Sequence, residues 1–450
     1  MRKFFALFVV LAILSASVFA GGSSQQPQQP ASGGQAAAPA APAKVQIRAS
    51  YWGDTKRFDL YDQIIKEFEK VHTNVTVIRE PVSWNDYWDK LSVQAAGGNA
   101  TDFLCMHPQY VADYVSKGVM EPLDKYVADK TISLDGWSQG VIDTGKFDGK
   151  IYMLAMGVVY SSAFVNTGVI KQLGLTPPAF EWSWDEARAL GLQVRKAADT
   201  QNKKNTYLLA TQITSLNNFR YFARQRNHEF YDTAGNIAVP VQDIQDWYTM
   251  WKDYQDQGIC QDAATATEFF NTTLENSLFA QDRVLVTYVP VVQFWLYNTT
   301  FPNKELAVVR HPGSKGSAYV GEFPEGAHYA VYAKTTPEKK LAAAQLLDFW
   351  LNDPRSLVLY KLDQGVPANT PVVQKYVIPV LDKYQVVAID FINTLSKISR
   401  PMIYPPPGAS QIDALFRNKA EMVQFGSKTP AAAAKEFYDE AVAIRAKANR

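Results

Sequence analysis

The stretch from Gly145 to Trp184 limits the fold more than any other part of the chain, because a turn, a strand and two helices follow one another in it without a break. Asp148 and Gly149 stand between two hydrophobic segments, and an Asp-Gly pair in that setting is a strong signal for a β-hairpin. Val158 to Val165 is mostly apolar and suits a buried strand. The stretch therefore predicts sheet and helix packed together.

Two helices are predicted after this strand. Asn166 or Thr167 can cap the first helix, and Gly174 ends it. Ser183 is expected to cap the second helix, and Glu186, three residues later, completes the pattern of a capping box.

The rest of the chain alternates in the same way between segments with strand and helix periodicity. Strands are expected at 45–52, 75–79, 102–106, 206–212, 284–286, 307–309 and 330–333. Helices are expected at 58–71, 83–96, 109–117, 241–257, 341–351 and 431–447. This order predicts an α/β fold with mainly parallel sheets.

The order of hairpin, strand, Asn-led helix, Pro-Pro and Trp-Asp-Glu in Gly145–Trp184 resembles the extracellular solute-binding proteins of bacterial ABC importers. The resemblance is to the carbohydrate-binding group that includes maltose-binding protein. A second match is 86–124, where a helix stops at two glycines and an Asp-led strand follows, although Thr101 stands where the family usually has proline. A third is Gly365 to Asn369, similar to the Gly-x-Pro-Ala stretch by which relatives cross between lobes.

The resemblance covers nearly all of residues 44–450 and implies a two-lobed periplasmic-binding-protein fold that is similar to type II. Each lobe would hold a mainly parallel sheet flanked by helices. About three hinge crossings, near residues 158, 305 and 364, would join the lobes. The implied boundaries are 44–158 plus 306–364 for the N-terminal lobe and 159–305 plus 365–450 for the C-terminal lobe.

The amino terminus predicts export. Two basic residues precede an apolar run, and small residues up to Ala20 suit a signal peptidase, so 1–20 is expected to be a signal peptide. The run is shorter than the roughly 18 residues that a membrane span requires. Residues 21–43, rich in Ala, Pro, Gln and Ser, are expected to form a disordered tether. Relatives usually carry a lipidated cysteine where Gly21 stands, so a periplasmic or secreted protein is expected.

Composition excludes several classes of function. A net charge of +1 without runs of like charge offers no basic surface for nucleic acid. The five histidines are scattered, and nucleotide and metalloprotease motifs are missing, so we expect neither a metal nor a cofactor. A monomer is expected. Cys105 and Cys260 are expected to be free and in different lobes, because a bridge between the lobes would restrain hinge motion.

A sugar site is expected between the lobes. Aromatic residues make up 13% of the chain, and their faces pack on the C–H faces of sugar rings while polar side chains bind hydroxyl groups. Ligands of open α/β sheets bind beyond the carboxyl ends of strands. The candidate stacking residues are Trp52, Trp84, Tyr160, Phe219, Tyr288 and Tyr404. The candidate hydrogen-bonding residues are Asp54, Gln109, Asn218 and Glu322.

Two details of this site follow. Tyr160 is expected beside both the hinge and the ligand, because it comes just after the first crossing. Asp54 and Glu322 are expected to be buried carboxylates without a paired cation, and such groups fit an uncharged or cationic ligand better than a phosphate or sulfate.

The resemblance implies the substrate-binding component of an ABC transporter, which captures a sugar or oligosaccharide between its lobes and delivers it to a membrane permease. Two alternatives stay open. One is a binder of another small solute, such as a polyamine or a glycerol derivative. The other is a secreted glycoside-active enzyme, in which Asp54 and Glu322 would form a carboxylate pair with side chains roughly 5 to 9.5 Å apart.

Overall fold

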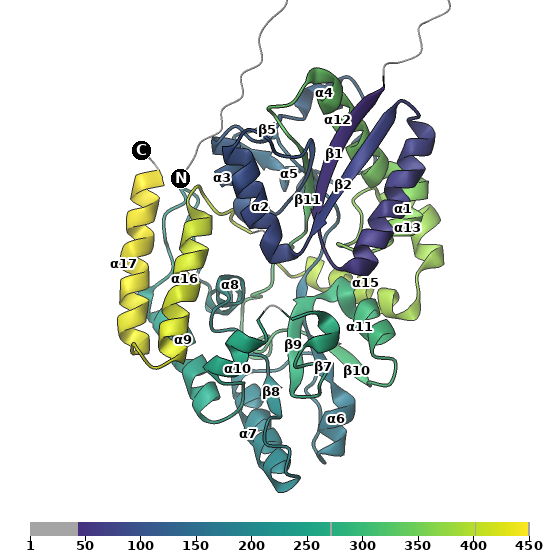
Figure 1. Cartoon of the computed structure of the whole chain (residues 1–450). Helices are drawn as coiled ribbons and strands as arrows, with labels where there is room; N and C mark the ends of the chain where they lie inside the picture. Colours follow the sequence, from purple (N-terminus) through teal and green to yellow (C-terminus); the bar gives the residue numbers. More distant parts are fainter. Residues whose placement is uncertain (1–43, 271, 401, 449–450) are drawn as a thin grey trace, which may run out of the picture. The chain divides into compact units, whose positions relative to one another are not determined.

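The computed structural model describes residues 44–270, 272–400 and 402–448, so the predicted signal peptide and tether lie outside the described residues. Two main sheets and one hairpin form within these ranges (Figure 1). The strands are β1 (Val45–Trp52), β2 (Val75–Val82), β3 (Phe103–Met106), β4 (Lys146–Phe147), β5 (Lys150–Ile151), β6 (Leu154–Ala155), β7 (Ser161–Asn166), β8 (Tyr207–Leu209), β9 (Val284–Pro290), β10 (Leu306–Val309) and β11 (His328–Val331).

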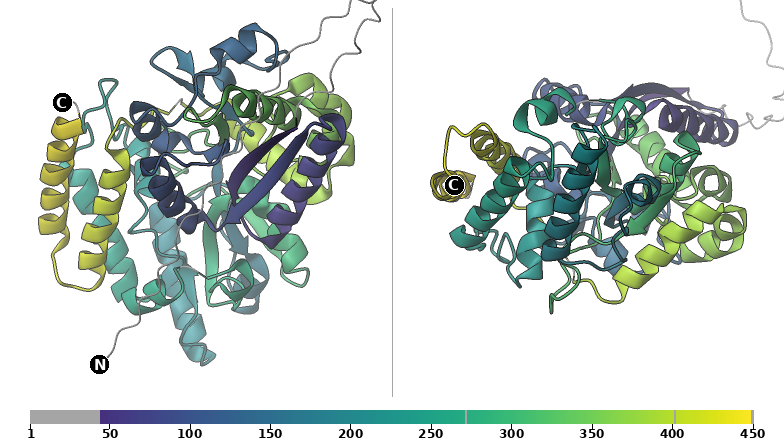
Figure 2. Two further views of the ribbon diagram at one scale, coloured as in Figure 1. Left: turned by 45° about the horizontal axis from the view of Figure 1, so that its top comes forward. Right: turned by 90° about the horizontal axis from the view of Figure 1, so that it is seen from below.

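Helices surround both sheets, and α1 packs beside α13 while α16 packs beside α17 (Figures 1 and 2). The α-helices are α1 (Thr55–Val71), α2 (Trp84–Ala96), α3 (Val111–Ser116), α4 (Asp124–Ala128), α5 (Gln139–Asp143), α6 (Thr167–Gln172), α7 (Trp184–Thr200), α8 (Leu216–Gln225), α9 (Val241–Asp256), α10 (Ala263–Glu268), α11 (Phe294–Thr300), α12 (Pro337–Asn352), α13 (Pro354–Tyr360), α14 (Thr370–Val372), α15 (Lys383–Ser396), α16 (Ala409–Gln424) and α17 (Pro430–Ala448). Shorter helical turns are η1 (Pro108–Tyr110), η2 (Leu274–Asn276), η3 (Val291–Gln293), η4 (Val373–Val377) and η5 (Ile378–Val380).

The local turn and cap predictions in Gly145–Trp184 are confirmed. Asp148 and Gly149 both have positive φ, 49° and 77°, and they connect β4 to β5 as a hairpin. Asn166, rather than Thr167, caps α6 by accepting a hydrogen bond from the amide of Val169. Ser183 and the helix α7 that it caps form the predicted capping box. Local side-chain chemistry thus decides where these elements begin.

The first sheet has the strand order β2-β1-β3-β11-β6 and the second has the order β10-β7-β9-β8. β1 is parallel to β2 and β3, but β11 is antiparallel to both of its neighbours. In the second sheet the β8–β9 pair alone is parallel among the described strands. The prediction of mainly parallel sheets is therefore wrong, and both sheets are mixed. The reason is that β11 and β7 enter their sheets directly from a crossing, at the edge where neighbouring strands end.

Each sheet has its own hydrophobic core. The first core includes Tyr61, Phe103 and Trp350, and the second includes Phe219 and Trp247. We call the residues around these two cores the first lobe and the second lobe. Cys105 is buried in the first core and Cys260 in the second, and both are free, which confirms the prediction for the two cysteines.

Three segments join the lobes and run side by side. Val158 pairs with Val366 in one antiparallel bridge. Val159 pairs with Glu325 in a second. The predicted first crossing is confirmed, and the third segment meets it at Val366. The predicted crossing near residue 305 is wrong. β10 pairs with β7, so the chain stays in the second lobe until after residue 309.

The carboxyl-terminal part of the chain also departs from the predicted boundaries. Beyond Val366, Ala368, Val373 and Val377 belong to the first core, so the chain has not yet passed to the second lobe. The chain then passes through α15 to α16 and α17, which pack on α9 in the second lobe. The first lobe therefore keeps the chain to residue 377, whereas the implied boundary had placed residues 365–450 wholly in the second lobe.

Glycine is required where the crossings touch. A Cβ atom on Gly157 would lie 2.5 Å from the carbonyl carbon of Gly365, and one on Gly326 would lie 2.2 Å from the carbonyl oxygen of Gly157. Gly365 also has a φ of 128°, a conformation that other residues rarely adopt. Each crossing thus supplies one glycine to a backbone-to-backbone contact. Among the described helices, none is long and apolar enough to cross a membrane.

We expect Gly157→Ala to lower the free energy of unfolding by at least about 2 kcal/mol, because the backbone of the neighbouring crossing cannot move aside as a side chain would. Urea denaturation followed by circular dichroism measures this change. Gly140→Ala in α5 is the matched control, since a Cβ there meets no atom within 4 Å. The control is expected to be neutral or stabilising by about 0.5–1 kcal/mol. Equal stability of the two variants would contradict the role of the glycine contact.

Candidate ligand-binding site

Loops from both sheets meet at the crossings, because several strands end there. In the first sheet, Met106 at the end of β3 pairs with His328, which comes just after the crossing glycine Gly326. In the second sheet, Pro290 at the end of β9 pairs with Ser161 at the start of β7. Open α/β sheets bind ligands beyond such strand ends. We call the region formed by these loops and the crossings the interlobe site.

Aromatic rings gather on the first-lobe side of this site. Trp52 is buried, and its ring centroid lies 4.8 Å from that of Trp84 and 5.4 Å from that of Trp88. Trp84 is 38% exposed and also packs on the ring of His107, with centroids 5.6 Å apart. Neighbouring rings therefore cover Trp52, whereas Trp84 keeps exposed surface that a sugar ring can reach.

On the second-lobe side, one face of α8 follows the second crossing. Asn217 donates a hydrogen bond from Nδ2 to Oε1 of Glu325 at 2.8 Å. One turn later, the guanidinium of Arg220 lies over the ring of Phe323, 4.7 Å from its centroid. Positions three and four apart share a helix face, so α8 presents polar side chains along the crossing.

Tyr288 contributes an unsatisfied hydroxyl at the end of β9. Its ring stacks on His311, with centroids 5.1 Å apart, and its buried hydroxyl has no hydrogen-bond partner among the described residues. His311 is held by a 3.0 Å contact between Nε2 and Oγ of Ser161. A buried polar group without a partner costs about 1–3 kcal/mol. A ligand hydroxyl that bonds Tyr288 would remove this cost.

Three histidines of the interlobe site are neutral near pH 7. Burial lowers the pKa of His107 to about 3, and the charges of His328 and Arg220 lower it further. Burial also lowers the pKa of His311 and of His328, in each case to about 4. These imidazoles therefore act as uncharged hydrogen-bonding groups. Within the described residues, no group of His, Cys, Asp and Glu has an arrangement that would hold a metal ion.

Tyr404 reaches the site from the segment between α15 and α16. Its hydroxyl hydrogen-bonds with Thr144, whose Oγ1 lies 2.9 Å from Nε2 of His328. Burial raises the pKa of Tyr404, so its hydroxyl stays protonated. The structure thus brings this predicted residue close to the second crossing.

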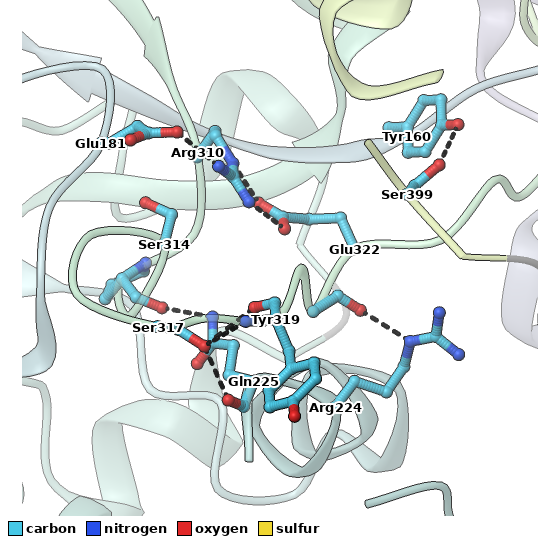
Figure 3. Close-up of polar contacts among 12 residues, drawn as sticks. Tyr160, Glu181, Arg224, Gln225, Arg310, Ser314, Ser317, Tyr319, Glu322 and Ser399 are labelled. Atoms are coloured by element: carbon cyan, nitrogen blue, oxygen red, sulfur yellow. Dashed lines mark hydrogen bonds and ion pairs between the residues drawn. The ribbon is translucent and has the colours of Figure 1, made fainter. Parts of the chain in front are cut away.

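Glu322 is placed differently from its prediction. It is fully buried, and its two carboxylate oxygens accept hydrogen bonds from Nε and Nη2 of Arg310 at 3.1 and 2.9 Å (Figure 3). Arg310 also contacts Glu181 at 2.5 Å. The expectation of a buried carboxylate without a paired cation is wrong for Glu322, because Arg310 neutralises it. This pair fixes the loop before the second crossing to the end of β10.

Asp54 is also placed differently. It is exposed, and it caps α1 by accepting a hydrogen bond from the amide of Arg57 at 3.0 Å. It lines a cavity of about 310 Å³ that Lys56 of the first lobe shares with Gln293 and Trp295 of the second. A larger hollow of about 450 Å³ lies along α1 and away from the crossings. Asp54 therefore borders a space between the lobes but is not a buried carboxylate.

Four predicted residues remain to be placed. Phe219 lies in the second core and stacks on Phe416, so it faces away from the interlobe site. Tyr160 is buried directly after the first crossing, which confirms its position at the hinge. Its hydroxyl lies 2.7 Å from Oγ of Ser399 (Figure 3).

The other two are polar. Asn218, in the first turn of α8, donates from Nδ2 to Oε1 of Gln212 at 2.6 Å, and its buried Oδ1 has no partner among the described residues. Gln109 follows His107 in η1 and is partly exposed. Asn218 lies in the helix that follows β8, and Gln109 lies in the helical turn that follows β3. A role for each in ligand binding stays a prediction.

Sequence analysis missed Asn217, Arg220, His311 and Glu325. Arg220 was hidden because an arginine in a helix is usually exposed, and its burial depends on Phe323, which is far away in the sequence. Glu325 stands three residues after Glu322. Nothing in the neighbouring sequence shows that Glu322, and not Glu325, pairs with an arginine. The helical spacing of 217, 220 and 221 was the one usable signal.

A further contact joins the lobes beside the interlobe site. Asp113 of α3 accepts hydrogen bonds from the amide of Gly408 at 2.7 Å and from the hydroxyl of Ser410 at 2.7 Å. Gly408 is the cap residue of α16 and supplies no capping side chain. A carboxylate of the first lobe thus caps a helix of the second.

Comparison with known proteins gives one family and a shared fold. Residues 63–386 match the family of bacterial extracellular solute-binding proteins. A binding protein of Brucella abortus (strain 2308) is 23% identical over 225 residues, which are 50% of this chain and 52% of that protein. The chain therefore spans about half the length of the curated relatives it matches.

Two solved structures have the same two-lobed fold. A periplasmic oligogalacturonide binding protein of Yersinia enterocolitica, in complex with saturated digalacturonic acid, aligns with a TM-score of 0.79 and 20% identity over 90% of this chain and 100% of that one. An ABC substrate-binding protein of Listeria monocytogenes, in complex with cycloalternan, aligns with a TM-score of 0.74 and 20% identity over 88% of this chain and 98% of that one.

Glu322→Gln is expected to lower the free energy of unfolding by about 3–5 kcal/mol, because it leaves Arg310 buried without its main counter-ion. Urea denaturation at pH 7 measures this loss. Glu181→Gln is the control, because Glu181 is half exposed and an exposed pair contributes less than about 1 kcal/mol. A stable Glu322→Gln protein with impaired ligand binding would instead restore Glu322 to the ligand site.

Glu325 predicts a pH-dependent stability. Burial raises its pKa from 4.5 to about 7, although the hydrogen bond from Asn217 and the charge of Arg220 lower it. The folded protein therefore holds this proton more tightly than the unfolded chain, and the associated stability is lost as the pH rises from about 4.5 to about 7. We compare the unfolding free energy of Glu325→Gln with that of the unchanged protein at each pH. The difference is expected to favour the variant by about 1–3 kcal/mol more at pH 8 than at pH 5. A difference in unfolding free energy that is the same at both pH values would disprove the shift.

Proposed function

Because the chain belongs to the family of bacterial extracellular solute-binding proteins, we propose that it captures a sugar or oligosaccharide between its two lobes. In this proposal the loaded protein delivers the sugar to the membrane permease of an ABC importer. It works as an exported monomer that carries no metal and no cofactor.

One observation carries the proposal. Two residues of the second lobe, Asn218 in the first turn of α8 and Tyr288 near the end of β9, hold a buried oxygen that has no hydrogen-bond partner among the described residues. The exposed ring of Trp84 lies across the crossings from them, on the first lobe. Aromatic faces and free hydrogen-bonding groups are what a ring with many hydroxyls needs.

The fold supports the same proposal. Two lobes with separate cores, joined by three adjacent crossings, can close on a ligand by hinge motion. A ligand that touches both lobes favours the closed form by its greater affinity for it. The relatives from Yersinia enterocolitica and Listeria monocytogenes were both solved with oligosaccharides, which supports a sugar as the ligand.

The alternatives have less support. A glycosidase would need two available carboxyl groups, but both oxygens of Glu322 are bound to Arg310. A polyamine site would need clustered carboxylates, and the same ion pair removes Glu322 from that role as well. We therefore propose binding without turnover.

A thermal-shift screen of mono- and oligosaccharides, followed by calorimetry, tests the proposal. Binding of at least one sugar is expected to raise the melting temperature, because a ligand that binds the folded state stabilises it. The sugar should be recovered unchanged after long incubation. Release of shorter sugars would favour the enzyme, and the lack of any sugar-induced shift would refute the proposal.

Tyr288→Phe is expected to weaken affinity for that sugar about 5- to 13-fold, because a lost hydrogen bond costs about 1–1.5 kcal/mol. Tyr126→Phe is the matched control, since the hydroxyl of Tyr126 is also buried without a partner among the described residues. Tyr126 lies in the first core, whereas Tyr288 packs on the second core and stacks on His311. Calorimetry should show unchanged affinity for the control. A loss of affinity shared by both variants would mean that Tyr288 acts through folding alone.

A further inference from the structure

Arg220 is a buried charge without a counter-ion. The residue is only 6% exposed, and its Nε atom has no hydrogen-bond partner among the described residues. Nη2 donates to the carbonyl of Ile403 at 3.2 Å, and the guanidinium stacks on Phe323. A carbonyl and a ring hold the group in place but do not neutralise it.

Three other arginines that are buried or nearly buried each have a carboxylate at ion-pair distance, whereas the buried Arg445 donates to the carbonyls of Gly235 and Pro407. These pairs are Arg310 with Glu322 at 2.9 Å, Arg224 with Glu229 at 2.6 Å and Arg57 with Asp363 at 2.8 Å. None of the ion pairs found among the described residues includes Arg220. Arg220 therefore differs from Arg310, Arg224 and Arg57 in having no carboxylate at ion-pair distance within the described part of the chain.

Burial lowers the pKa of Arg220, whereas Glu229, Glu325 and Asp413 lie close enough to raise it. None of these carboxylates forms an ion pair with Arg220 among the described residues, and Glu229 pairs with Arg224 instead. His107, from the first lobe, is neutral because of its burial. Glu325 directs Oε1 to Asn217, and burial raises its pKa to about 7, so it is only partly ionised at neutral pH. The charge of Arg220 acts on Asp413 of α16, but burial raises the pKa of Asp413. Asp413 forms its ion pair with Arg417, at 3.9 Å.

A guanidinium stays protonated in proteins, so burial does not remove this charge. Burial of an unpaired charge is strongly unfavourable. A ligand carboxylate that forms an ion pair with the buried cation reduces this cost. Hydrogen bonds between Arg and a carboxylate are about twice as strong as those between neutral groups. The free Nε–H of Arg220 is therefore suited to an anionic group on the ligand.

We propose that Arg220 makes the interlobe site selective for a sugar that carries a carboxylate, that is, for oligosaccharides containing a uronic acid. This inference rests on the proposed function and names the class of its ligand. It replaces the expectation of an uncharged or cationic ligand, which depended on unpaired carboxylates at Asp54 and Glu322. Arg220 is then the residue that determines specificity, through direct contact with the ligand.

The test compares two forms of one ligand, trigalacturonate and its fully methyl-esterified form, which differ in charge and little in shape. Calorimetry with the full exported chain is expected to show at least about 50-fold tighter binding of the acid, as an additional charge-assisted contact implies. Added NaCl should weaken binding of the acid and leave the ester unaffected. Equal affinity for the acid and the ester would overturn the inference.

Arg220→Gln is expected to reduce the preference for the acid to less than about 5-fold. Arg226→Gln is the matched control, because Arg226 follows α8, is exposed and pairs with Asp243 and Asp246. The control should keep the preference. If Arg220→Gln weakens acid and ester equally, Arg220 is a structural residue and the inference fails.

Arg220→Lys covers the case in which Arg220→Gln does not fold, because it keeps the charge and is expected to keep part of the preference for the acid. A folded Arg220→Lys protein without any preference would count against the inference. Neutral galactotriose is included to separate this inference from the function on which it rests. Binding of galactotriose as tightly as the acid would overturn the inference alone, whereas binding of no sugar at all would overturn the proposed function.

Discussion

The contact among Gly157, Gly326 and Gly365 is the constraint on which the rest of the structure depends. It allows three crossings to run side by side, so strands on either side begin and end at one place. The loops beyond those strand ends are then forced together. The interlobe site thus exists because backbone, with no side chain between, joins the lobes. Its polar groups are positioned by the same short segments that join the lobes.

In the second crossing, Glu322 and Glu325 are three positions apart and have different roles. Glu322 is bound by Arg310 and fastens the crossing to the second lobe. Glu325 lies beyond this anchor and has Asn217 as its partner, so it can respond to a ligand or to a proton. Among the arginines, Arg310 and Arg224 likewise have a carboxylate partner, whereas Arg220 has none at ion-pair distance among the described residues. Ionic groups in this protein are therefore best understood by whether a partner is already present.

The sequence predicted those structural features that depend on residues close together in the chain. The caps at Asn166 and Ser183 and the Asp148-Gly149 turn follow from side chains within a few residues, and the order of strands and helices follows from periodicity. It could not predict which sheet β10 joins, because a short apolar strand has the same pattern in either sheet. It also misjudged Phe219 and Glu322, since an aromatic ring in the core and one in a site look alike until distant partners such as Phe416 and Arg310 are known.

The cap that Asp113 places on α16 ties the position of the lobes to the backbone of one helix. The amides of Gly408 and Ser410 bond to that carboxylate, and their own helix offers no replacement. If the lobes part, these two amides meet solvent. Their protons would then exchange with water faster than those of the following turns. The rate of amide hydrogen exchange at the start of α16 therefore reports the separation of the lobes. It can be measured without a ligand and at a distance from the interlobe site.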